Sequence, residues 1–395
     1  MRVLFVPRDD ADRIFGGDVV QMQKTAEALR DLGVLVDVGP PESATAGYDV
    51  VHLWTSLHFP DKLLAHLDRL TPARAAKIPV ALSTIWAPHH LVRWMDAARR
   101  WLFSRHPNGA QLTLERAAGD LEAIASRSLD FTMDDGERLS AFAPHPFTTL
   151  CRQVLRHIDL ILPNSWMELQ AIFTFLGDFA AYGVVPNAVD ARDFEIDGDP
   201  DLPAELRAGN YALMSARFDT RKQQDFLMLA VKTLDIPMVF VGDATDQEIF
   251  ARMRALATNR HAPVFYYPFL PHSRLRHLYN AARVHVLPSI FESPGLSSME
   301  AALLDCAIVT GNLAFESEYF QDGAYYCDPC DAFSIRNAVR SAWESYDDEA
   351  PRRRALAERI RNDYTWRHAG EATLRAYRRS AINATPTSAN ATPNH

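Results

Sequence analysis

Two glutamates lie eight positions apart in the segment FESPGLSSMEAALLDC, residues 291–306. Glu292 follows an apolar run typical of a strand, and Glu300 lies in a segment with the pattern of a helix that begins near Ser297 and Ser298. The start of such a helix offers unpaired backbone N–H groups, which suit phosphate or sugar oxygens. An ionised carboxylate only accepts hydrogen bonds and therefore suits sugar hydroxyls. The pair predicts a site for two polyols, although the spacing alone equally fits two surface glutamates.

Positive charges and glycines add to this interpretation. Arg217 and Lys222 lie in SARFDTRK, directly after an expected strand of the same half, so they should reach the same sheet edge as Glu292. Two cations there can neutralise a diphosphate, the arginine as a fork and the lysine as a point charge. Gly16 and Gly17 open an expected helix, where glycine lets the backbone approach a phosphate. Any tight turn uses such a glycine pair as well.

Short apolar runs alternate with helical patterns almost throughout the chain, which predicts parallel, doubly wound α/β sheets. In the first half the apolar runs are residues 3–6, 34–38, 49–54, 80–85, 159–164 and 182–187. In the second half they are residues 212–217, 238–243, 264–269, 284–289, 307–311 and 324–328. Two α/β halves should form their ligand crevice at the carboxyl ends of the strands.

The domain boundaries follow from changes in composition. Residues 187–210 carry five Asp, two Pro and two Gly without a clear period, which is typical of a linker. The predicted parts are a first domain at 1–187 with a helical insertion at 91–156, a linker at 188–210, a second domain at 211–367, a helix at 368–380 and a disordered tail at 381–395.

The insertion contains an apolar stripe with arginines off its face. Leu91, Trp94, Met95, Ala98, Trp101 and Leu102 share one helical face, and Arg93, Arg99 and Arg100 lie away from it. A helix packed on the domain is the favoured interpretation. A helix that lies on a membrane surface is the alternative.

Composition excludes several classes of protein. The net charge of −9 argues against a nucleic-acid-binding protein. No secretory leader or apolar run of 18 residues is present, and four cysteines in 395 residues fit a reducing compartment, so we expect a cytoplasmic protein. Cys327-Asp328-Pro329-Cys330 has no second metal-ligand pair, and Asp197-Gly198-Asp199 lies among turn residues, so no metal site is predicted.

Together these segments resemble glycosyltransferase family 4, a group of retaining enzymes with the GT-B fold. The resemblance rests on the Gly16-Gly17 loop, on VVPNAVDARDF (184–194), on SARFDTRK (215–222) and on the E-x7-E segment FESPGLSSMEAA (291–302), in this order. It implies two Rossmann-like domains that face a central crevice, with the acceptor on the first and the nucleotide sugar on the second.

The resemblance also implies roles for residues. Arg217 and Lys222 would bind the donor diphosphate, and Glu300 would bind the ribose. Glu292, as the catalytic residue, would hold the donor sugar together with the backbone of Gly295 and Leu296. Gly16 and Gly17 would complete the donor site, which would contain no metal and no cofactor.

The chain departs from the family pattern at several positions. Ala188, Gln223 and Asp305 stand where glycine is frequent. The family often places a histidine after a strand of the first domain, but Trp86 occupies that spacing here, and His89 and His90 follow. These three residues are the candidates for the acceptor side.

The resemblance predicts a retaining, hexosyltransferase-type enzyme of polysaccharide biosynthesis. It would move a sugar from a nucleotide diphosphate sugar to a saccharide or a lipid-linked acceptor, without a metal and without a protein nucleophile. The enzyme would be cytoplasmic, and peripheral contact with the inner face of the membrane is the alternative location. A non-catalytic nucleotide-sugar-binding protein and a sugar-nucleotide epimerase of similar fold remain the alternative functions.

Overall fold

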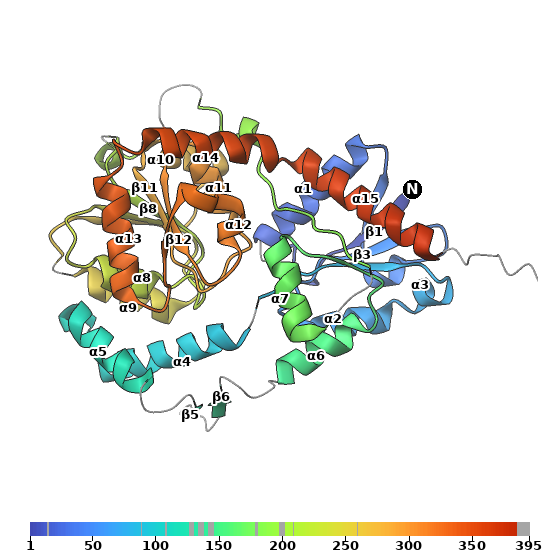
Figure 1. Ribbon diagram of the computed structural model, residues 1–395, viewed down its shortest axis with the longest axis horizontal. Helices are drawn as coiled ribbons and strands as arrows, with labels where there is room; N and C mark the ends of the chain where they lie inside the picture. The colour runs from blue at the N-terminus through green and yellow to red at the C-terminus, as the bar shows by residue number, and fades with distance from the viewer. Residues whose placement is uncertain are drawn as a thin grey trace, which may run out of the picture. The chain divides into compact units, whose positions relative to one another are not determined.

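The computed structural model describes residues 1–13, 16–87, 89–106, 109–125, 130–132, 138–140, 146–177, 181–196, 202–207, 209–258 and 260–384 (Figure 1). The chain forms two compact units. Unit 1 contains residues 1–86, 146–186 and 366–395, and unit 2 contains residues 87–145 and 187–365. The chain therefore passes from one unit to the other four times, after residues 86, 145, 186 and 365.

Unit 1 is built on a five-stranded parallel sheet with the order β2-β1-β3-β4-β7. The strands are β1 (Arg2–Val6), β2 (Leu35–Val38), β3 (Val50–Leu53), β4 (Val80–Ser83) and β7 (Leu160–Leu162). Most of their residues are buried, as expected for a parallel sheet with both faces covered. The predicted strand at 182–187 is reduced to one bridge between Ile161 and Tyr182.

Helices cover this sheet, and the last helix of the chain is one of them. The helices are α1 (Gly17–Asp31), α2 (Pro60–Arg69), α3 (Thr71–Ala75), α6 (Pro146–Leu155), α7 (Trp166–Leu176) and α15 (Trp366–Ala384). Helix α15 packs closely on α1, because a Cβ added to Gly370 would lie 2.8 Å from the Cβ of Ala28. The hydroxyl of the buried Tyr377 in α15 also lies 2.6 Å from Nδ1 of His52 in β3.

Unit 2 is built on a six-stranded parallel sheet with the order β10-β9-β8-β11-β12-β13. The strands are β8 (Ala212–Ser215), β9 (Met238–Val241), β10 (Val264–Tyr267), β11 (Val284–Leu287), β12 (Ala307–Gly311) and β13 (Ala324–Cys327). Numbered from β8, this is the Rossmann order 3-2-1-4-5-6, in which the topology switches direction between β8 and β11. The prediction of two parallel, doubly wound α/β domains is confirmed.

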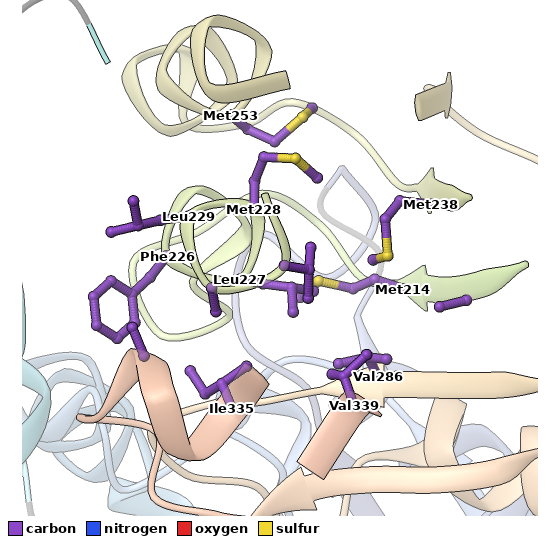
Figure 2. Packing of buried hydrophobic residues seen from close by; sticks show 14 of the residues in the cluster. Met214, Phe226, Leu227, Met228, Leu229, Met238, Met253, Val286, Ile335 and Val339 are labelled. Carbon is purple, nitrogen blue, oxygen red and sulfur yellow. The ribbon is translucent and has the colours of Figure 1, made fainter. Parts of the chain in front are cut away.

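Helices of unit 2 pack around this sheet and on one another. They are α8 (Gln224–Val231), α9 (Gln247–Ala257), α10 (His272–Ala281), α11 (Leu296–Leu303), α12 (Glu316–Phe320), α13 (Ala332–Glu344) and α14 (Ala350–Asp363). Figure 2 shows one core, in which Met214 and Val286 from the strands meet Leu227 of α8 and Val339 of α13.

The structure corrects the prediction that the helical insertion belongs to the first domain. Helices α4 (His89–Arg105) and α5 (Leu114–Ala125) belong to unit 2 and not to the first domain. Leu102 and Phe103 of α4 and Leu114 and Ala117 of α5 are buried in the core that α8, α9 and α13 also form. The amphipathic pattern indicated a packed helix but carried no information on which core would receive it.

Most of the predicted stripe on α4 is buried where the structure describes it. Met95, Ala98 and Leu102 are at most 2% exposed, and Trp101 is half-buried against the same core, which agrees with the packed-helix interpretation. The side chains of Leu91 and Trp94 lie outside the described residues. Among the described helices, none has both the length and the apolar character needed to cross a membrane.

The predicted linker also differs from the structure. Residues from 187 onward belong to unit 2, and Val189, Phe194, Leu202 and Leu206 are buried in its second core cluster. The turn-rich composition concealed these apolar anchors because they follow no regular period. Residues 197–201, with the Asp197-Gly198-Asp199 segment, lie outside the described residues, as does the tail after residue 384.

Candidate functional site

The loop between β8 and α8 carries three cations at the topological switch point. Asp219 shapes this loop, because its Oδ1 accepts hydrogen bonds from the backbone N–H of Arg221 at 2.9 Å and of Lys222 at 3.1 Å. Gln223 follows in the left-handed conformation at φ 60°. Its buried amide donates to the carbonyl oxygens of Pro288 at 2.8 Å and Pro329 at 3.0 Å. The loop is therefore tied to the end of β11, which precedes Glu292.

Glu292 meets two of these cations. The ammonium of Lys222 donates to Oε1 of Glu292, and Nη1 of Arg221 lies 3.3 Å from the same oxygen. Arg221 also lies over the ring of Phe291, 5.0 Å from its centroid. Glu292 is only 5% exposed. Burial raises the pKa of this carboxyl, but Lys222 and Arg221 outweigh burial and hold the pKa below its ordinary value. Glu292 is therefore an anion between two cations at neutral pH.

The start of helix α11 lies beside this cluster. Its N-cap is Gly295, at φ 89°, and no side chain caps the helix. A Cβ at this position would lie 3.0 Å from Cδ2 of Leu287 and 3.4 Å from Cγ of Glu292. The site thus needs glycine both for the backbone conformation and for the space. The first N–H groups of α11, from Leu296 onward, supply the positive end of the helix dipole near Glu292.

Asn187 connects a second predicted segment to this loop. Its side-chain amide donates to the carbonyl oxygen of Ser293 at 3.2 Å, and its backbone N–H donates to the hydroxyl of Tyr319 at 2.9 Å. The P-N-A-V-D segment therefore holds the loop before α11. Ala188, which stands where glycine is frequent, is 1% exposed and fits without strain in φ.

Glu300 lies one turn into α11 and is 9% exposed. Its Oε2 accepts a hydrogen bond from the hydroxyl of the buried Tyr279 at 3.0 Å. This hydrogen bond orients the carboxylate, a group that can accept several hydrogen bonds.

Three residues near the cluster escaped the sequence prediction. The sequence prediction named Lys222 but not the adjacent cation Arg221. His285 of β11 is buried, and burial together with Lys222 lowers its pKa to about 3, so it is neutral. Glu316 begins α12 and is 1% exposed, and burial reinforced by Glu292 raises its pKa well above the ordinary value. Neither His285 nor Glu316 lies in a motif that singles it out.

Arg217 behaves differently from Lys222. Its carbonyl oxygen accepts a hydrogen bond from the amide of Gln224 at 2.7 Å, which fixes the backbone after β8. In the described part of the chain no ion pair holds the Arg217 guanidinium, which is half-buried. The structure thus brings Lys222, Arg221, Glu292 and Gly295 together and leaves the Arg217 side chain outside this ion-pair cluster.

Of the remaining predicted residues, Gly16, Gly17 and Trp86 belong to unit 1, whereas His89 and His90 begin α4 of unit 2. Gly16 is the N-cap of α1 and Gly17 its first residue. Trp86 is 2% exposed and packs in the core of unit 1, and its backbone N–H donates to Glu168 at 2.8 Å. Its indole is therefore a core group, whereas the prediction placed it on the acceptor side. The side chains of His89 and His90 lie outside the described residues.

The cysteines carry no sign of redox or metal chemistry in the described part of the chain, where no cluster of three potential metal ligands occurs. Cys327 is buried, and burial raises the pKa of the Cys330 thiol to about 12. Both thiols are therefore protonated at neutral pH and are poor nucleophiles.

Residues 204–363 match the family model described as glycosyl transferases group 1. This part of the chain belongs to that family. The matched residues carry the whole cluster of Arg221, Lys222, Glu292 and Glu300. Among curated relatives of this glycosyltransferase segment, alpha-maltose-1-phosphate synthase of Mycolicibacterium smegmatis is 27% identical over 158 residues, which are 37% of this chain and 41% of the relative. The chain matches less than half of the length of its curated relatives.

Solved structures resemble the chain over nearly its full length. Sucrose-phosphate synthase of Thermosynechococcus elongatus has a TM-score of 0.70 at 15% identity, with 97% of this chain and 100% of that chain covered. Anabaena HepE in complex with UDP-glucose has a TM-score of 0.67 at 14% identity, with 96% and 100% covered. At this identity the likeness establishes the fold, which is that of the GT-B glycosyltransferases.

Proposed function

We propose that the chain is a retaining glycosyltransferase that takes a hexose from a nucleotide diphosphate sugar. The observation that carries the proposal is the cluster of Glu292, Arg221 and Lys222 at the switch point of unit 2, beside the uncapped start of α11. Ligands of Rossmann-type sheets bind outside the carboxyl ends of the strands at this point. The family match of the same residues and the UDP-glucose in the HepE complex support this choice of donor.

The cluster can separate the charges that sugar transfer creates. Arg221 and Lys222, with Arg217 nearby in the sequence, face the leaving diphosphate, whose charge grows as the glycosidic bond breaks. The N-terminal N–H groups of α11 add a positive dipole. Glu292 accepts hydrogen bonds from the sugar and stabilises its oxocarbenium-like charge. The leaving phosphate oxygen takes the proton of the acceptor, which attacks from the same face, so neither a protein nucleophile nor a metal is required.

Glu300 would hold the ribose of the donor. Its carboxylate is oriented by Tyr279, and a carboxylate can accept hydrogen bonds from two ribose hydroxyls. Gly16 and Gly17 of unit 1 are proposed to approach the donor phosphates through their backbone, as their position at the start of α1 permits.

The acceptor is proposed to be a saccharide in the cytoplasm. The names of two relatives, alpha-maltose-1-phosphate synthase and an O-antigen chain mannosyltransferase of Escherichia coli, support acceptors of this kind, the second 25% identical over 183 residues. A lipid-linked saccharide is the second form of acceptor, with His89 and His90 as candidate contacts. The burial of Met95 and Ala98 gives the membrane-surface alternative no support.

A donor screen tests the proposal. Thermal unfolding is recorded with UDP-glucose, GDP-mannose, ADP-glucose and dTDP-glucose, because a ligand of the folded state raises the melting temperature. Release of the nucleoside diphosphate is then measured with maltose or mannose as the acceptor. We expect stabilisation and release for one donor, and loss of both in Lys222→Met.

The matched control is Arg192→Met, because Arg192 is an exposed cation of the same unit, with a side chain that is 84% exposed. It should retain both signals. Binding without release in any acceptor mixture would favour a nucleotide-sugar-binding protein, and the absence of binding to all four donors would contradict the proposal.

A further inference from the structure

An arginine of the inserted helix α4 reaches the loop that carries the proposed phosphate-binding cations. Arg99 is only 2% exposed, although it lies off the apolar stripe of α4. Its Nη1 donates to the carbonyl oxygen of Thr220 at 2.9 Å. The same nitrogen lies 3.6 Å from Oδ1 of Asp225. Arg99 thus touches both the middle of the loop 216–223 and the first turn of α8.

Asp225 explains why this buried charge is stable. Its side chain is fully buried, and its second oxygen lies 3.6 Å from Nη1 of Arg252 on α9. A buried charge is tolerated when it is paired, so the carboxylate and the two arginines form one compact ion cluster. Phe103 of α4 packs under this cluster, with the Arg252 guanidinium 4.8 Å from its ring centroid. Two contacts, one ionic and one cation–π, therefore fix α4 to α8 and α9.

The hydrogen bond from Arg99 to Thr220 lies next to the two cations that contact Glu292. The peptide that Arg99 holds lies between Asp219, which caps the turn, and Arg221, which contacts Glu292. A rotation of this peptide would move the Arg221 and Lys222 backbones together. Gln223 fixes the far end of the loop to the end of β11, so Arg99 supplies the constraint in the middle.

We propose that Arg99 is a positioning residue that holds the loop 216–223 in the conformation that binds the donor diphosphate. The inference rests on the proposed donor role of Arg221 and Lys222. It gives the inserted helices a function, since α4 brings to unit 2 a side chain that the α/β core itself does not provide. A loop that spends only a fraction of its time in the competent conformation weakens binding by that same fraction.

Two arginines on one aspartate supply a matched pair of variants. Arg99→Met removes the bond to Thr220 and one ion pair with Asp225. Arg252→Met removes the other ion pair with Asp225 and leaves the loop untouched. Methionine approximates the length of the side chain and limits the cavity. Arg99→Lys keeps a charge near Asp225 but cannot reproduce the fork of the guanidinium.

Hydrogen–deuterium exchange of the unliganded full chain tests the clamp directly. We expect faster exchange in peptides that cover residues 217–223 for Arg99→Met, little change for Arg252→Met, and an intermediate rate for Arg99→Lys. Equal exchange in both methionine variants would overturn the proposal, because the effect would then come from the loss of an arginine partner of Asp225 and not from the bond to Thr220. If the melting temperature shows that Arg99→Met fails to fold, the exchange of Arg99→Lys is compared with that of wild type instead.

Titration calorimetry with UDP, GDP and ADP tests the functional consequence. For the nucleotide that wild type binds, Arg99→Met should raise the dissociation constant about tenfold, which corresponds to a loop that is competent about one tenth of the time. In turnover the KM for the donor should rise by a similar factor with kcat within about threefold, because a bound diphosphate orders the loop itself. Loss of binding in Lys222→Met with wild-type binding in Arg99→Met would refute the positioning role alone. Wild-type binding in Lys222→Met would instead refute the proposed donor site.

Discussion

Replacing Lys222 with methionine removes the nearer of the two cations that Glu292 contacts. Breaking a buried ion pair from one side costs about 3–5 kcal/mol, because the remaining charge stays buried without its partner. Glu292 is 5% exposed, so water reaches it little, but Arg221 remains 3.3 Å away. We therefore expect a loss of about 2–3 kcal/mol in the free energy of unfolding, below the full value for an isolated pair.

The double variant Lys222→Met, Glu292→Gln isolates the reason for that loss. If the cost comes from an unpaired carboxylate, replacing Glu292 with neutral glutamine should restore about 1–2 kcal/mol relative to Lys222→Met alone. Urea unfolding of wild type, both single variants and the double variant, followed by circular dichroism, gives the four free energies. Strictly additive losses would refute the reasoning, because they would mean that Lys222 and Glu292 do not interact in solution. Donor binding should be lost in the double variant all the same.

Three further predictions concern neighbouring groups. Glu300→Ala should weaken donor binding by about 1.5–3 kcal/mol, the range for a hydrogen bond to a charged group, and unchanged affinity in calorimetry would exclude it from the site. EDTA should leave transfer unchanged, and a loss that magnesium or manganese restores would contradict the metal-independent mechanism. Glu316 has a raised pKa when folded, so its contribution is complete below about pH 4.5 and falls by about 1.4 kcal/mol per pH unit up to the folded pKa. Relative to wild type, Glu316→Gln should gain stability at that rate in urea unfolding, whereas a pH-independent difference would show that folding does not raise the pKa of Glu316.

The fold and the ligand-facing loops could be predicted because each rests on a local pattern. Apolar runs of strand length alternating with helical periods determine a parallel sheet, and the carboxyl end of each strand then determines where Lys222 and Glu292 must lie. Gly295 was named through the family resemblance, and the structure adds a physical reason, because a residue with positive φ before a helix start favours glycine.

The partners of the inserted helix could not be predicted. The stripe of α4 indicated an apolar face, but Arg99 lies off that face and finds Asp225 more than 120 positions later in the chain. Such a pair becomes visible only when the packing of α4 on unit 2 is known. The sequence prediction missed Glu316 for a related reason. Its burial depends on how β12 and β13 pack around it and not on its neighbours in the sequence.

The ion pairs around Glu292 have a consequence for how the donor enters. In the unliganded site Lys222 and Arg221 already satisfy one carboxylate, so their charge does not stand alone in a buried pocket. A diphosphate brings more negative charge than Glu292 and would draw both cations toward itself. The carboxylate then loses its partners at the moment when the hydroxyls of the donor sugar arrive to replace them. In the proposed donor site, binding of the phosphates and of the sugar would be coupled through one oxygen of Glu292. A nucleoside diphosphate without its sugar should then leave that oxygen unsatisfied and bind more weakly than the complete donor.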